Sequence, residues 1–128
     1  GETGARLYHF AARDRGGVVL AAGCLALIFT ESPSLSEPEH VSGQRCLRTS
    51  CAPEVPPAFT GAWNVGGSVN QFGQITLDLN SGAADFNIFL VGHYAPGGGD
   101  HGAFSGEWSY STIVGPQATG SFTATPLP

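Results

Sequence analysis

The sequence has few charged residues, and its positive charges are confined to the first half. Charged residues make up 12% of the 128 residues, and the formal net charge is −5. There is no lysine, and the five basic residues are Arg6, Arg13, Arg15, Arg45 and Arg48. Most of the affinity of proteins for nucleic acids comes from cations that neutralise phosphates. The lack of any cation after Arg48 therefore argues against nucleic acid as a partner.

Cysteine is scarce, with three residues at Cys24, Cys46 and Cys51. Cys46 and Cys51 lie in a segment rich in proline and serine, whereas Cys24 lies inside an apolar run. In an oxidising compartment we expect a disulfide between Cys46 and Cys51, and two free thiols are the alternative. Their spacing, without further cysteines or a nearby histidine pair, argues against a zinc site.

Long apolar runs are absent with one exception, Gly16–Phe29, which reads GGVVLAAGCLALIF. As a helix it would span about 21 Å, less than the roughly 30 Å of a bilayer's hydrocarbon core and typical of a signal peptide. Arginines precede the run and glutamates follow it, so the positive-inside rule places the N-terminus in the cytoplasm. We therefore expect residues 16–30 to form a short apolar helix that acts as a membrane or signal segment. Its apolar side chains include Val18, Leu20, Leu25, Leu27, Ile28 and Phe29.

Alternatives for this run stay open. The segment could be removed as a signal peptide or retained as a short anchor. Residues Ala21–Cys24 resemble a bacterial lipobox, which implies a lipid on Cys24. A core helix of a soluble domain is less favoured, because the rest of the chain has the pattern of β structure and offers no helical partner.

The composition changes twice after residue 30. Residues 31–57 are rich in proline and serine and lack a periodic apolar pattern, which predicts an extended linker. From residue 58 onward apolar and polar residues alternate, as in QITLDLN at 74–80. We expect a mainly β fold of about five strands over 58–128, as a small antiparallel meander or partly closed barrel. The expected organisation is a basic leader on the cytoplasmic side at 1–15, the apolar segment at 16–30, the linker at 31–57 and the β domain at 58–128.

The pattern F-[ST]-G-x-W occurs twice, at Phe59–Trp63 and Phe104–Trp108. A glycine inside a strand marks a bulge or a close backbone approach, and the tryptophan would pack where the strand bends. Trp63 and Trp108 either fill the core at two corners of one sheet or, together with Tyr94, line a ligand pocket. The first motif and Leu90–Tyr94 resemble strands of avidin-like and lipocalin-like barrels. This resemblance implies a curled antiparallel sheet and allows for a small apolar ligand.

The segment His93–Phe104, HYAPGGGDHGAF, resembles the zinc loop of copper/zinc superoxide dismutases, in which H-[FY]-N-P, four variable residues and H-G are typical. The resemblance implies that His93 bridges copper and zinc and that His101 binds zinc, and Asp100 could add an oxygen ligand. Ala95 replaces the asparagine of the family pattern, and no His-x-His pair precedes the loop. We therefore expect no cofactor and a polar, glycine-rich hairpin loop, with zinc or copper binding as the alternative.

The sequence contains no G-x-S-x-G motif and no phosphate loop. We expect a non-catalytic structural or interaction protein, anchored in a membrane, whose β domain lies outside the cytoplasm. Its partners would be the membrane and other membrane-protein subunits, as in the accessory subunits of photosynthetic or respiratory complexes. The alternatives are a secreted or lipid-anchored barrel that binds a small apolar ligand, and a metal-binding protein that uses His93 and His101.

Overall fold

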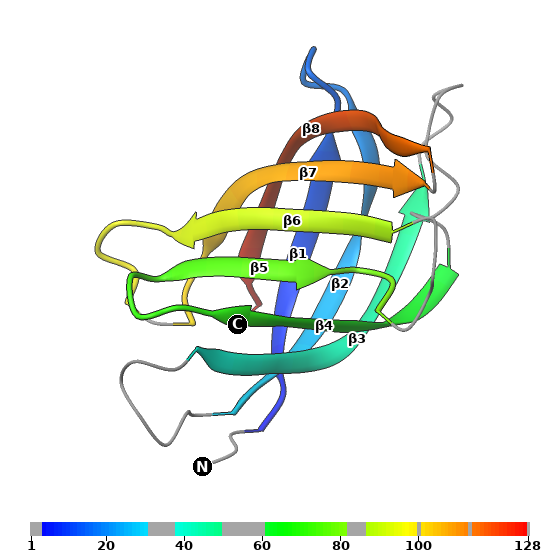
Figure 1. Cartoon of the computed structure of the whole chain (residues 1–128). Helices are drawn as coiled ribbons and strands as arrows, with labels where there is room; N and C mark the ends of the chain where they lie inside the picture. Colours follow the sequence, from blue (N-terminus) through cyan, green and yellow to red (C-terminus); the bar gives the residue numbers. More distant parts are fainter. Residues whose placement is uncertain are drawn as a thin grey trace.

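The computed structural model describes residues 4–30, 38–49, 61–81, 87–99, 101–112 and 114–127, which form a closed antiparallel β-barrel (Figure 1). Each strand pairs with its neighbour in sequence, and β8 pairs with β1 to close the sheet. The strands are β1 (Arg6–Arg13), β2 (Val19–Thr30), β3 (Glu39–Thr49), β4 (Gly61–Val69), β5 (Gln74–Asp78), β6 (Asn87–Tyr94), β7 (Phe104–Thr112) and β8 (Gly115–Pro126).

The antiparallel β character confirms part of the expected fold, and the strand count corrects the rest. We expected about five strands after residue 58, preceded by a helix, whereas the described residues form eight strands and contain no helix. The expected leader contributes β1, and the expected linker contributes β3. The barrel is closed rather than partly closed.

The apolar run forms the end of a β-turn and most of β2, so the prediction of a helix is wrong. Leu25, Leu27 and Phe29 are fully buried inside the barrel, and Leu20 is also buried. Val18 is 54% exposed in the turn, and Ile28 is partly buried. No helix in the described part of the chain has the length and hydropathy needed to cross a bilayer.

Alternate residues of the strands face the barrel interior. In β6, for example, Ile88 and Leu90 are buried, whereas Phe89 and Val91 are 38% and 43% exposed. Serine and threonine occupy much of the outer face, as in β8, where Ser121, Thr123 and Thr125 are exposed. The interior is filled largely by aromatic side chains, which include Tyr8, Phe10, Phe29, Phe104, Trp108, Tyr110 and Phe122.

Glycines allow the strands to bend closely past one another. At six of them an ideal Cβ would lie 1.9–2.2 Å from a carbonyl oxygen of the adjacent strand. Gly92 and Gly106 are direct register partners in β6 and β7, so the two strands approach closely at this point. A small closed barrel needs such kinks, because its sheet curves strongly. The six residues are Gly23, Gly43, Gly67, Gly92, Gly106 and Gly120.

Candidate functional site

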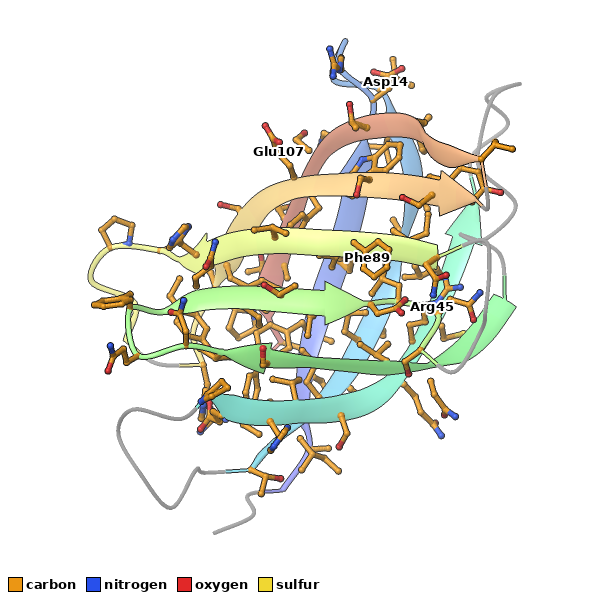
Figure 2. All side chains as sticks on the ribbon, viewed as in Figure 1. Asp14, Arg45, Phe89 and Glu107 are labelled. Atoms are coloured by element: carbon orange, nitrogen blue, oxygen red, sulfur yellow. The ribbon has the colours of Figure 1, made fainter. Side chains whose placement is uncertain are left out.

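The two ends of the barrel differ in the groups that they carry. We call the end where β2 finishes and β3 begins the capped end, because residues 95–99 and 101–103 of the β6–β7 connection lie there. We call the opposite end, where β5 finishes and β6 begins, the arginine end. Arg45 lies in the half of β3 that leads to it (Figure 2).

His101 fixes the β6–β7 connection to three other strands. Its ring stacks on Phe29 of β2, with ring centroids 3.9 Å apart and an interplanar angle of 17°. Its Nε2 lies 2.8 Å from Oε1 of Glu39 in β3, and its carbonyl accepts a 2.6 Å hydrogen bond from the hydroxyl of Tyr8 in β1. These contacts hold His101 at a φ of 63°, a region that residues other than glycine rarely adopt.

An aromatic cluster lies beneath this cap. The ring of Phe104 is 5.2 Å from that of Tyr8, 6.2 Å from that of Tyr94 and 5.9 Å from that of Phe122, each in edge-on geometry. Tyr8, Phe104 and Phe122 are at most 1% exposed. Edge-on aromatic contacts add to the free energy gained by burying the rings. The capped end is therefore a closely packed part of the barrel.

We expect the hydroxyl of Tyr8 to lose its proton at a higher pH than an exposed tyrosine does, and this difference can be used to test whether the cap is closed. Burial raises the pKa of Tyr8 from 10.0 to about 12. The positive charge of Arg6 lowers this pKa and the negative charge of Glu39 raises it, each with a smaller effect than burial. The unfolded chain loses this proton at lower pH than the folded chain. The contribution of this group to stability is therefore complete below pH 10 and is lost as the pH rises to about 12.

We expect a tyrosinate absorbance titration to show a step near pH 12 that Tyr8→Phe removes and Tyr94→Phe leaves in place. Tyr8→Phe should also lower the free energy of unfolding at neutral pH by about 1 kcal/mol, because the hydrogen bond to His101 is lost. An unchanged titration of Tyr8→Phe would contradict this description of the cap.

The arginine end carries a buried charge. Arg45 is 1% exposed, and with Asn80, at 5%, it makes up the buried polar set of the described residues. Burial lowers the pKa of Arg45 to about 10, and the carboxylate of Asp78 acts in the opposite direction. Arg45 is therefore still a cation at neutral pH, inside a barrel lined mainly by apolar side chains.

Asp78 organises the turn beside Arg45. Its Oδ1 accepts a hydrogen bond from the backbone N–H of Asn80 at 2.9 Å, and its Oδ2 accepts one from Nδ2 of Asn87 at 2.9 Å. Nδ2 of Asn87 also lies 3.2 Å from the carbonyl oxygen of Asn80. These bonds join the end of β5 to the start of β6 and place the carboxylate where it acts on Arg45.

The aromatic residues that, in the second interpretation of the motif, would line a ligand pocket lie at different levels of the barrel. Tyr94 pairs with Phe104 at the capped end, whereas Trp108 pairs with Leu90, four residues further along β7. Trp108 is 2% exposed, and its indole N–H donates a 2.8 Å hydrogen bond to the carbonyl of Arg13. Trp108 thus fills the core, as the first interpretation of the repeated motif proposed.

Trp63 and its motif can be placed only by register. The backbone of Trp63 in β4 pairs with that of Arg45 in β3, and its side chain lies outside the described set. Residues 50–60, which precede Gly61, also lie outside the described residues. In the second motif Gly106 makes the close backbone approach that we expected of a strand glycine.

The two histidines of the expected metal loop lie in different surroundings. His93 is exposed near the end of β6, whereas His101 is partly buried against Phe29 and Glu39. Asp100 lies outside the described residues. Within the described ranges, no group of three or more histidine, cysteine, aspartate or glutamate residues is arranged to hold a metal ion. Zinc or copper binding at this loop stays an untested alternative.

Sequence reasoning did not identify Glu39, Phe29 or Tyr8 as neighbours of His101. It placed Phe29 in a membrane helix and Glu39 in a linker. No local motif joins these positions, because they meet only when the sheet closes. The expected disulfide is not shown either, since Cys46 has a free thiol and Cys51 lies outside the described residues.

A comparison with protein families, with curated proteins and with solved structures finds no match to this chain in any of the three.

Proposed function

We propose that this chain is a non-catalytic module that binds a small ligand with an apolar body and an anionic group. An eight-stranded barrel is wide enough to hold one small ligand, and because aromatic side chains fill much of this interior, the ligand would have to insert beside them. Small-molecule sites combine a mainly apolar lining with a few placed polar groups. An aromatic interior with a buried cation near one end matches that combination.

The observation that carries the proposal is the buried guanidinium of Arg45. Taking a charge out of water costs several kcal/mol, and a pKa of about 10 leaves Arg45 charged at neutral pH. Arginine is well suited to carboxylates and phosphates, because its planar group donates parallel hydrogen bonds. We infer that Arg45 attracts the anionic group of the ligand.

The contrast between the two ends favours entry at the arginine end. At the capped end, His101 contacts β1, β2 and β3 through hydrogen bonds and ring stacking, and aromatic rings fill the space beneath it. Binding there would require these contacts to break. The apolar body of a ligand that enters at the arginine end would reach Trp108 and Tyr110, which lie further along β7 from the cap.

A matched pair of ligands tests this proposal through tryptophan fluorescence. We would titrate the full chain with long-chain carboxylates and with alcohols of the same chain length. The expected result is a saturable change with one ligand per chain, and an affinity for the carboxylate about tenfold or more above that for the alcohol. Arg45→Met should weaken carboxylate binding by about tenfold or more and leave alcohol binding nearly unchanged.

Arg6→Met is the control, because it removes an exposed arginine at the capped end and should leave both affinities unchanged. Circular dichroism of each variant checks that the barrel is folded. The absence of a saturable response to any member of the panel would refute ligand binding of this kind. Equal carboxylate affinity in Arg45→Met would refute the role of Arg45.

The hypothesis of a membrane-anchored accessory subunit with an extracytoplasmic domain stays a prediction. Its anchor was expected at residues 16–30, which belong to the β1–β2 turn and β2. Without that helix, the hypothesis has less support than ligand binding.

A further inference from the structure

Two cysteines face each other on the outer wall of the barrel. Cys24 in β2 and Cys46 in β3 are direct register partners, and both have free, exposed thiols. Their chain neighbours Leu25, Arg45 and Leu47 are buried. Because side chains alternate between the two faces of a strand, both thiols lie on the same outer face.

The strand register brings the Cα atoms of Cys24 and Cys46 into the range that a disulfide spans. Register partners in an antiparallel pair have Cα atoms about 4.5–5.5 Å apart. Disulfides join residues whose Cα atoms are about 4.4–6.8 Å apart. The nearest positions on the same face of β2 are Ala22 and Ala26, whose short side chains leave room for a small reagent.

We propose that Cys24 and Cys46 form a dithiol site that low-molecular-weight disulfides, such as oxidised glutathione, convert to an internal disulfide. One cysteine thiolate attacks a sulfur of oxidised glutathione, which forms a mixed disulfide and releases one glutathione thiolate. The other cysteine thiolate then attacks the protein sulfur of that mixed disulfide and releases the second glutathione. The two protein thiols lose two electrons and two protons, and one oxidised glutathione becomes two reduced molecules.

The geometry favours this bond over two competing fates of the thiols. After the first step the second thiol is already beside the mixed disulfide, so the internal reaction has a large advantage over attack by another molecule. Capture of zinc is disfavoured, because structural zinc sites use four ligands and no group of three metal-binding residues is present in the described ranges. Exposed disulfides are easily reduced, so the site should be reversible.

The full chain with Cys51→Ser isolates the two thiols for a test. We would equilibrate it with mixtures of reduced and oxidised glutathione, trap free thiols with iodoacetamide and measure intact mass. The expected product is a monomer that has lost two hydrogens, in roughly tenfold or greater excess over glutathione adducts. The same mixture in urea should lose this excess, because the register that aligns the thiols is lost.

Two double variants serve as matched controls because each keeps a single thiol. Cys24→Ser combined with Cys51→Ser keeps Cys46, and Cys46→Ser combined with Cys51→Ser keeps Cys24. Each should give only the glutathione adduct. In the chain with all three cysteines, peptide mapping after oxidation should join Cys24 to Cys46. Three results would overturn the proposal: a Cys46–Cys51 bond in that chain, glutathione on both thiols of Cys51→Ser, or a disulfide-linked dimer as its main product.

Discussion

Gly67→Ala will destabilise the barrel by about 3 kcal/mol or more, whereas Gly66→Ala will change its stability by less than about 1 kcal/mol. The two glycines are neighbours in β4, so the variants share composition and strand. A Cβ on Gly67 would lie 2.0 Å from the carbonyl oxygen of Thr76 and 2.9 Å from Cα of Leu77. These are backbone atoms of β5, and no side-chain rotation can move them away.

Gly66 differs because its nearest contact is a side chain. A Cβ there would lie 3.3 Å from Cβ of Ser81, which lies in a turn and can shift by the few tenths of an ångström required. Urea unfolding of the full chain, followed by circular dichroism, measures both variants. Equal midpoints for Gly66→Ala and Gly67→Ala would show that the strands do not approach each other as described.

Phe104→Ala should cost about 3–5 kcal/mol of unfolding free energy, the range for removing a large buried aromatic side chain. Phe104 is 1% exposed and contacts the rings of Tyr8, Tyr94 and Phe122, so its loss leaves a cavity among rings that cannot all move inward. A cost of this size is a large part of the total stability of a typical domain.

The matched control is Phe72→Ala, which removes the same ring from a turn where it is 80% exposed and should change stability by less than about 0.5 kcal/mol. If Phe104→Ala proves too unstable to measure, Phe104→Leu should still unfold at lower urea than the wild type, at a cost of about 1 kcal/mol. A stability of Phe104→Leu equal to that of the wild type would contradict the tight packing under the cap.

The sequence predicts some strands well because their alternation is undisturbed. In β5 and β6 the buried residues Ile75, Leu77, Ile88 and Leu90 alternate with polar or partly exposed residues, and the alternation at 74–80 was the basis for the expected β fold. The helix prediction at β2 failed for a specific reason. Its outward positions include Cys24 and Ala26, so the strand is apolar at almost every position and its period cannot be recognised.

The sequence did not predict strand β3, because its inner face has too few apolar residues rather than its outer face too many. Two of its inward positions are Gly43 and Arg45, so the inner face of this strand lacks the apolar repeat that marks a strand. The candidate sites depend on this strand, since Glu39, Arg45 and Cys46 all belong to it. Their partners on β1, β2 and the β6–β7 connection are distant in sequence, and only closure of the sheet brings them together.

Pairing of β8 with β1 has a consequence for how this protein can meet other macromolecules. In the part of the chain that the structure describes, every strand pairs with a neighbour on both sides, so no strand is a free sheet edge over its whole length. An incoming peptide therefore finds no full-length edge strand on which to extend this sheet. Recognition of another chain is expected to use side chains of the outer wall or the connections between strands, and self-association by strand addition is disfavoured.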